Sequence, residues 1–501
     1  MAERLARSGV VSLAGSGFAA LAALLLTSVV GNQLGASGTG LFFQAMGIFT
    51  ILTQVLRLGT NSGIVRFIAE QRAFDRAGGE WRIVLIALVP VAVVSGLAAL
   101  VLWFFAGTLA GWLATPQEAD GLTDLLQAMA PYVVLGAVLG VLHIVTRMLR
   151  GVTAFTVLQS VLLPASRLVS VLVVTVIGTT AWAAFEAWLV PLPFWLVVTV
   201  LVIASPLVRD IRRRGELAAD DRPAAGTFWR FNAPRTVSQG FETALEWADV
   251  LIVAALASPA TAGIYAVLTR AVRAGALVDR AMRVAVSPTI SALLARGDRE
   301  GATRLHTTVV RAMVLMTWPF HLSLITLGSA VLAIFGPEFV VGHAPMVLLA
   351  VAMMFQSAAG MLQSILLQGG RSTWQMGNKA VALTLSIGGN LLTVGTWGLW
   401  GAAVTWFVVV VVDNLLAAFQ VHRRMQVRLR PRQVLTAAVI PLLVFGLGGW
   451  ALSGWVGTDL VRLVIAVACL GLIHVAVLWV LRRRLSLVTL WRRFPVIGRF
   501  A

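Results

Sequence analysis

The chain has 501 residues, of which 59% are hydrophobic and only 12% are charged, and its mean hydropathy is +0.89. Soluble domains are roughly 25% charged, so this composition excludes a globular protein in water and requires a membrane as the solvent. The formal net charge of +18 does not indicate nucleic-acid binding, because the arginines are scattered through short connections and form no single basic face.

The apolar runs predict about fourteen transmembrane helices, since about 20 residues suffice to cross a hydrocarbon core of about 30 Å. The first run begins near Gly9, after Arg4 and Arg7, and is too long for a cleaved signal peptide, so it is interpreted as a retained helix. In chain order the predicted helices span residues 9–31, 39–64, 82–106, 122–147, 152–178, 182–207, 232–257, 261–287, 305–335, 343–368, 374–396, 399–421, 434–453 and 460–481.

The positive charges between these runs alternate as the positive-inside rule requires. The connections 32–38, 107–121, 179–181, 258–260, 336–342, 397–398 and 454–459 contain no arginine or lysine and are assigned to the outside. The inner connections carry Arg66, Arg72, Arg76 and Arg82; Arg147 and Arg150; Arg209, Arg212, Arg213, Arg214 and Arg222; Arg296, Arg299 and Arg304; Arg371 and Lys379; Arg423, Arg424, Arg428, Arg430 and Arg432. This pattern predicts that both termini are cytoplasmic.

The hydrophilic connection 209–231 divides the chain. We predict an N-terminal six-helix lobe at 1–208, a second six-helix lobe at 232–425, and two extra helices with a basic amphipathic tail at 426–501. An even helix number permits a parallel repeat of the lobes. Gly40-Leu41-Phe42 and Gly263-Ile264-Tyr265 fit such a repeat, although coincidence explains the match equally well. The tail from Leu481 to Phe500 is expected to lie on the anionic inner leaflet, with partner binding as the alternative.

Charges within the predicted spans are the main functional signal, because each costs at least ~2.5–3.5 kcal/mol to insert. In the span 232–257, Glu242, Glu246 and Asp249 share one helical face with Arg235 and Gln239. An antiparallel hairpin through Ser258-Pro259 would bring Asp249 to the level of Arg270 and Glu246 to that of Arg273. We favour ion pairs that permit insertion, and keep Glu242, Glu246 and Asp249 as candidate groups for coupling to H⁺ or Na⁺.

Arg57 and Arg167 have no acidic neighbour in their own predicted helices. Arg57 could equally well snorkel to the inner surface, whereas Arg167 lies near the middle of its span, where snorkelling is not available. Together with Arg280 they would form a cationic floor for a phosphate or pyrophosphate, which guanidinium groups bind in a forked manner. The candidate substrate-binding residues are Arg57, Arg167, Arg280, Arg273 and Arg270.

Other polar residues in the spans could line the cavity above the cationic floor or could hold neighbouring helices together. For each residue taken singly, the role of holding helices together is favoured. They are Gln44, Gln54, Asn61, Gln159, Gln356, Gln363, Asn378, Asn390 and Asp413. His143, His321 and His474 lack metal-ligand spacing and are expected to be structural. Cys469 has no partner cysteine and is expected to lie in the core.

No motif of nucleotide hydrolysis or metalloenzyme chemistry is present in the sequence, and no outer connection is long enough for a catalytic domain. We therefore expect neither an enzyme nor a resident cofactor.

The segment from Ser12 to Glu70 resembles the opening of the polysaccharide transporters, the lipid-linked oligosaccharide flippases of the multidrug/oligosaccharidyl-lipid/polysaccharide exporter superfamily. The matching residues are Leu34-Gly35, Gly38-Thr39-Gly40-Leu41-Phe42, Leu58-Gly59 and Val65-Arg66-Phe67-Ile68-Ala69-Glu70. The second half adds Ala248-Asp249, Gly263-Ile264-Tyr265, Ser287-Pro288, Gly297-Asp298, Leu366-Leu367-Gln368-Gly369-Gly370-Arg371, Asn390 and Trp397-Gly398-Leu399-Trp400-Gly401-Ala402-Ala403.

The resemblance covers about residues 9–425 and implies two six-helix lobes around a central cavity. It also implies alternating access in a bacterial inner membrane, with an undecaprenyl-pyrophosphate-type oligosaccharide moved to the outer leaflet. Membrane lipids are then partners, and the resemblance is compatible with polysaccharide polymerase or assembly proteins as further partners. A multidrug or cation antiporter, which would need Glu242 or Asp249 for cation exchange, remains the alternative. A membrane glycosyltransferase or ligase would need a catalytic outer loop, which the sequence lacks.

Overall fold

The computed structural model describes residues 2–74, 78–114, 118–178, 180–213, 224–428 and 430–482. Regular structure in these ranges is helical, and each predicted span is occupied by helix. Eleven helical stretches are long and apolar enough to cross a membrane, and the first, Val11–Ala73, contains two predicted spans. The prediction of an all-α polytopic membrane protein is confirmed. Arg76, Arg214, Arg222 and the predicted tail beyond Arg482 lie outside the described residues.

The chain forms two compact units, Met1–Gly263 and Ile264–Ala501. Helix α11 (Pro259–Arg273) crosses the boundary between them. The predicted lobes, 1–208 and 232–425, describe a repeat of the sequence, and that division stays a prediction.

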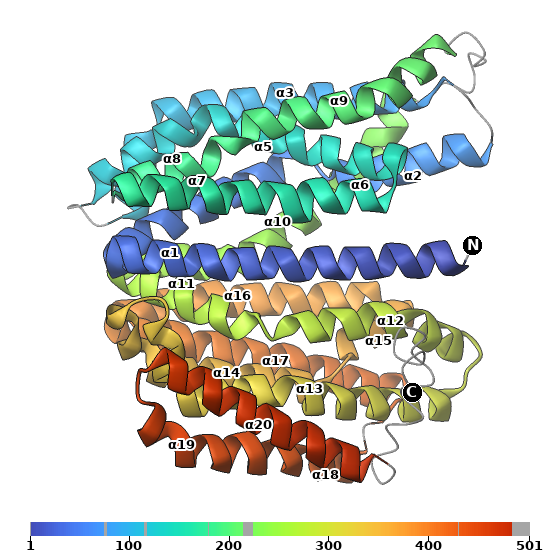
Figure 1. Ribbon diagram of the computed structural model, residues 1–501. Coiled ribbons are helices and arrows are strands. Elements are labelled where there is room, and N and C mark those ends of the chain that lie inside the picture. The colour runs from blue at the N-terminus through green and yellow to red at the C-terminus, as the bar shows by residue number, and fades with distance from the viewer. Residues whose placement is uncertain are drawn as a thin grey trace. The chain divides into compact units, whose positions relative to one another are not determined.

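The first unit is built around α5, which packs against α1, α3 and α9 (Figure 1). Its helices are α1 (Ala2–Leu56), α2 (Thr60–Ala73), α3 (Glu80–Phe104), α4 (Ala106–Leu113), α5 (Ala119–Arg150), α6 (Val152–Thr156), the π-helical segment η1 (Val157–Leu162), α7 (Leu163–Ile177), α8 (Ala181–Leu189), α9 (Pro191–Arg212) and α10 (Ala225–Leu256). Small residues on α5 allow close approach of α1: a Cβ on Gly136 would lie 2.8 Å from Thr53 Cγ2 and 2.9 Å from Phe49 Cζ.

Helix α3 has one exposed apolar face and one buried face. Leu85, Val89, Val93, Leu97 and Leu100 follow one another at three- to four-residue spacing and are all exposed. The opposite face of α3, which includes Ile83, Ala87 and Val91, is buried. An exposed stripe of large apolar side chains is costly in water, so this face fits the hydrocarbon core of a bilayer.

The membrane helices are less regular than the apolar runs predict. The first predicted span and most of the second form one continuous element, α1, which is kinked at Gly35, where φ is 64°. The span predicted near 39–64 is interrupted, because α1 ends at Leu56 and α2 begins at Thr60. The predicted helices 261–287 and 343–368 are likewise interrupted, at Ala274-Gly275 and at Gly360-Met361. Hydropathy does not detect such breaks, because the residues around them remain apolar.

The second unit is organised around α13, which packs against α12, α14 and α18. Its helices are the rest of α11, α12 (Ala276–Ala295), α13 (Arg299–Ala333), the 3₁₀ turn η4 (Pro337–Gly342), α14 (His343–Ala359), α15 (Leu362–Gln368), α16 (Ser372–Trp397), α17 (Leu399–Arg424), α18 (Pro431–Pro441), the π-helical segment η5 (Leu442–Leu447), α19 (Gly448–Val456) and α20 (Leu460–Leu481). Helices α16 and α17 form a tight hairpin at Gly398, where φ is 52°.

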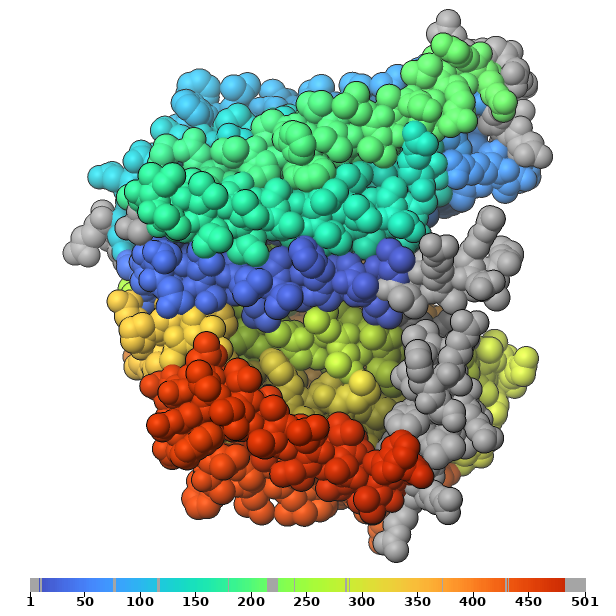
Figure 2. Space-filling model, viewed as in Figure 1, coloured from blue at the N-terminus to red at the C-terminus, as the bar shows by residue number. Residues whose placement is uncertain are grey.

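The last three helices, α18 to α20, cover one face of the second unit (Figure 2). Helix α20 packs through Leu463, Ala466 and Leu470, while Val461, Leu472 and Val480 are among its exposed apolar residues. Cys469 is exposed on this helix, so the prediction of a core cysteine is wrong. Its neighbour Leu470 takes the buried position.

Candidate substrate-binding site

Arg57 lies in a break between two membrane helices. It follows the last residue of α1, and the next two residues, Leu58 and Gly59, have φ values of 52° and 67°. The left-handed conformation is rare for a bulky residue such as Leu58, and strained backbone of this kind persists where surrounding structure holds it. Thr60 satisfies the carbonyl oxygen of Arg57, to which both its backbone N–H (3.1 Å) and its hydroxyl (2.7 Å) donate.

The guanidinium of Arg57 packs against α5 at Gly140, because the absence of a side chain there leaves room for it. A Cβ at that position would overlap Nε, Cζ and one terminal nitrogen of Arg57. Phe49 and Thr53 on α1 and Arg57 directly after it follow at four-residue spacing, and they lie along Gly136 and Gly140 of α5. This packing directs the arginine into the helix bundle.

Arg167 lies on the buried face of α7. Leu163, Val171 and Thr175, at four-residue spacing from it, are buried, whereas Val169 and Val173 are exposed. The guanidinium carbon of Arg167 lies 3.6 Å from the centroid of the Trp188 ring on α8. Trp188 itself is 3% exposed and packs edge-on against Phe49 at 5.5 Å. An aromatic face stabilises a cation without neutralising it, so the positive charge stays available to a ligand.

Neither arginine has a carboxylate partner among the described residues. The Nε atoms of both Arg57 and Arg167 are buried and make no hydrogen bond within this part of the chain. His143, 3% exposed, lies on α5 one turn from Gly140, beside which Arg57 is held. Arg57 and Arg167 are linked through Phe49, which lies one turn before Thr53 on α1 and packs on Trp188. Within its described residues the first unit thus holds two arginines without a carboxylate partner, which favours binding of an anion with several acceptor oxygens.

Glu186 and Trp188 on α8 were missed by the sequence analysis. Glu186 is partly buried, two residues before Trp188, and has no ion-pair partner in the part of the chain that the structure describes. The sequence contains no signal for the Trp188 contact, because it joins helices α7 and α8 through their side chains only.

The remaining candidate arginines belong to the second unit. The Nη1 of Arg270 donates to the carbonyl oxygen of Ala266 (3.0 Å), and Arg273 lies 5.7 Å from the ring centroid of Trp406. Arg280 is exposed on α12. The shared cationic floor of Arg57, Arg167 and Arg280 and the ion pairs Asp249–Arg270 and Glu246–Arg273 would join residues of different units, and they stay predictions.

The three acidic candidates lie on α10 in the first unit. Glu242 and Glu246 are exposed, and Asp249 is buried, with its Oδ1 accepting the Val250 N–H at 2.9 Å. Asp249 therefore differs in environment from the two glutamates.

A polar cluster in the second unit includes Gln363, Asn378 and Asp413, for which a role in holding helices together is the favoured prediction. Lys379 Nζ lies 2.8 Å from Asp413 Oδ2, and Gln363 Nε2 donates to Asp413 Oδ1 at 3.0 Å. Asn378 and Gln420 exchange two amide hydrogen bonds of 2.9 and 2.8 Å. These contacts confirm the connector interpretation for Gln363, Asn378 and Asp413.

Among the other polar candidates and the histidines, some have an unpaired buried side-chain oxygen and others bond to the backbone. Buried side-chain oxygens of Asn61, Gln159 and Asn390 have no hydrogen-bond partner within the described ranges, so these three remain candidates for lining a cavity. His321 and His474 bond to backbone carbonyl groups, as expected for structural histidines.

No protein-family model matches the sequence. No curated protein matches it either.

Solved structures are similar to the chain at low sequence identity. A lipid II flippase MurJ in an inward closed conformation has a TM-score of 0.74 and 12% identity, with 95% of this chain and all of the flippase covered. An inward-facing multidrug resistance MATE family transporter of the MOP superfamily has a TM-score of 0.65 and 15% identity, covering 83% of this chain and 98% of the transporter. The MATE multidrug transporter DinF-BH has a TM-score of 0.60 and 14% identity over 84% of this chain and 96% of its own. The chain therefore shares its fold with these flippase and MATE structures.

Proposed function

We propose that this protein is a flippase that moves an undecaprenyl-pyrophosphate-type lipid-linked oligosaccharide from the inner to the outer leaflet of a bacterial cytoplasmic membrane by alternating access. The observation that carries the proposal is the pair of arginines in the first unit, Arg57 and Arg167, which have no carboxylate partner among the described residues. A pyrophosphate offers several acceptor oxygens, which guanidinium groups bind in a forked manner.

The chemistry of the site favours an anion over a cationic drug. Arg167 is stacked on Trp188, and Arg57 is held beside Gly140, so both positive charges are fixed in place. A cation entering this region would be repelled by both, at a cost that the low local dielectric increases. The solved structure of a lipid II flippase, with which the chain shares its fold over 95% of its length, supports the same substrate class.

The orientation in the membrane is part of the proposal. The arginine-rich connections would face the cytoplasm, with both termini on that side. Substrate would then enter from the inner leaflet, where precursors with a pyrophosphate head group are assembled, and membrane lipids would surround both units. Polysaccharide polymerase and assembly proteins would be partners that take up the flipped product.

A multidrug or cation antiporter is the second candidate. It is supported by the MATE family structures and by the acids on α10, where Glu242 and Glu246 are exposed. In the flippase these acids have another role, which is coupling of transport to H⁺ or Na⁺.

The two candidates are separated in cells that depend on this chain. We expect Arg167→Ala and Arg280→Ala, expressed at the wild-type level, to abolish surface-polysaccharide assembly and to leave the lipid-linked precursor on the inner leaflet. Arg296→Ala, which removes an exposed arginine from the connection before α13, is the matched control and should have no effect. Normal export in Arg167→Ala and Arg280→Ala would contradict the proposal, and loss of drug resistance alone would favour the antiporter.

A further inference from the structure

An open cavity of about 750 Å³ lies in the second unit, and none of the candidate substrate-binding arginines lines it. It is lined by Arg299, Glu300, Thr303, Gln426, Arg428, Arg430, Arg432 and Gln433. These residues come from the start of α13, from the connection between α17 and α18, and from the first turn of α18. Four arginines and one glutamate give the lining a net charge of +3, which suits an anionic ligand.

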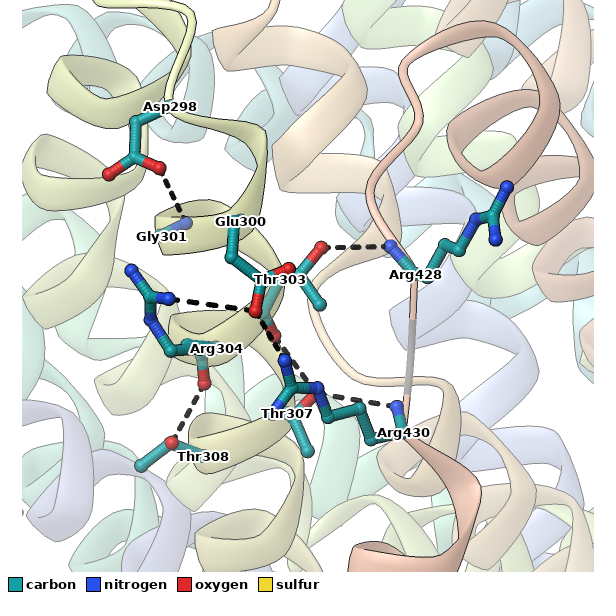
Figure 3. Close-up of polar contacts among 9 residues, drawn as sticks. All are labelled: Asp298, Glu300, Gly301, Thr303, Arg304, Thr307, Thr308, Arg428 and Arg430. Atoms are coloured by element: carbon teal, nitrogen blue, oxygen red, sulfur yellow. Dashed lines mark hydrogen bonds and ion pairs between the residues drawn. The ribbon is translucent and has the colours of Figure 1, made fainter.

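The connection between α17 and α18 is fastened to α13 by its backbone. The N–H of Arg428 donates to Thr303 Oγ1 (3.1 Å), and the N–H of Arg430 donates to Thr307 Oγ1 (3.4 Å), as Figure 3 shows. Both threonine residues are buried on α13. Because the backbone makes these contacts, the side chain of Arg428 is free to serve another purpose.

The arginines of the cavity are unequally neutralised. Glu300 forms ion pairs with Arg430 and with Arg304, the latter at 3.5 Å (Figure 3). Arg299, Arg428 and Arg432 are exposed and make no side-chain ion pair or hydrogen bond within the described ranges. A carboxylate of the chain itself thus occupies one part of the cavity, and three guanidinium groups remain for a ligand.

The positive charge of the cavity comes from its arginines and not from the N-terminus of α13. Asp298 caps this helix, since its Oδ1 accepts the Gly301 N–H at 2.7 Å (Figure 3). The other arginine-rich connections satisfy the positive-inside rule equally well, but a cavity with converging arginines is a stronger feature than a topology signal. Lipid head groups lie near the ends of membrane helices, so an anionic head group is one candidate source of such a ligand.

We propose that this cavity binds the phosphate of an anionic group, held by Arg299, Arg428 and Arg432, at the cytoplasmic membrane surface. A lipid head group and a soluble phosphate compound share this chemistry. Because the threonine contacts tie the connection before α18 to α13, occupancy of the cavity would stabilise the packing of the last three helices on the second unit. The site is independent of the proposed flippase activity, because none of its residues belongs to the candidate substrate site.

The test measures binding to the purified full-length protein in detergent by isothermal titration calorimetry. The probes are short-chain phosphatidylglycerol, short-chain phosphatidylcholine and inorganic phosphate. We expect phosphatidylglycerol to bind and phosphatidylcholine to bind much more weakly. Arg428→Gln and Arg432→Gln should each weaken binding about fivefold, the value expected for one arginine near an anionic head group. Glu300→Gln should tighten it, because it removes the one carboxylate among the described residues that line the cavity.

Arg424→Gln is the matched control, since Arg424 is exposed at the end of α17 and does not line the cavity. Inorganic phosphate that binds with the same dependence on Arg428 and Arg432 would identify a soluble phosphate compound as the ligand. Inorganic phosphate without effect would identify the lipid. Equal phosphatidylglycerol affinities in the wild type, Arg428→Gln, Arg432→Gln and Glu300→Gln would overturn the proposal. If the arginine variants do not fold, an unchanged affinity in Glu300→Gln overturns it alone.

Discussion

The guanidinium of Arg57 occupies the space beside Gly140 in which any other residue would hold its Cβ. We predict that Gly140→Ala displaces Arg57 and reduces transport about as strongly as Arg57→Ala, on the order of tenfold or more, because the loss of one charged contact in a desolvated site is costly. The measurement is the initial rate of precursor translocation at equal protein levels.

Gly96→Ala on α3 is the control for this prediction, because a Cβ there meets no atom within 4 Å. The double variant Gly140→Ala/Arg57→Ala should be no worse than Arg57→Ala, since the two changes act on one interaction. Additive losses would show that Gly140 matters for packing rather than for the position of Arg57.

The stacking of Arg167 on Trp188 leads to a second prediction. Arg167→Lys keeps the charge but loses the planar group, so it should retain only part of the affinity for the lipid-linked substrate. Trp188→Ala should weaken binding by roughly 1–2 kcal/mol through loss of the cation–π contact. Trp182→Ala, which removes an exposed tryptophan from the same helix, should bind substrate like the wild type. Equal effects of the two tryptophan variants would show that Trp188 does not contribute to substrate binding.

The sequence predicts the helical architecture well and the site only in part. Apolar length and the alternation of arginines act over whole segments, so they locate the spans regardless of local detail. They also single out Arg57 and Arg167, because unpaired charges in apolar runs are rare. They do not reveal Gly140 or Trp188, since those contacts depend on which faces of two helices meet. The exposure of Cys469 was not predicted for the same reason, whereas the break after Leu56 was not predicted because the residues around it remain apolar.

The cluster of Lys379, Asp413 and Gln363 should stabilise the second unit. We expect Asp413→Ala to lower its free energy of unfolding by roughly 1–3 kcal/mol, which is less than for a fully buried pair because Lys379 is 40% exposed. The double variant Lys379→Met/Asp413→Leu should recover much of the loss, because no unpaired charge remains. Thermal unfolding in detergent measures both. An unchanged free energy of unfolding in Asp413→Ala would show that the pair contributes nothing to stability.

The acids of α10 offer a test of coupling. If Glu242 carries the coupling ion, Glu242→Gln should abolish the dependence of transport on an imposed proton or sodium gradient and leave substrate binding intact. Glu246→Gln and Asp249→Asn, tested in parallel, identify which acid is responsible. Gradient-dependent transport that survives in all three variants would place the coupling site elsewhere.

The central claim is that Arg57 and Arg167 bind the pyrophosphate of a lipid-linked sugar, and translocation in proteoliposomes tests it most directly. Purified wild-type protein and the Arg57→Ala and Arg167→Ala variants are reconstituted with a lipid-linked pyrophosphate oligosaccharide, and its appearance on the opposite leaflet is followed, with a cationic dye as the competing substrate. We predict that the wild type moves the pyrophosphate lipid but not the dye, and that both variants lose this activity. Transport of the dye by the wild type, or unimpaired translocation of the lipid by both variants, would contradict the account.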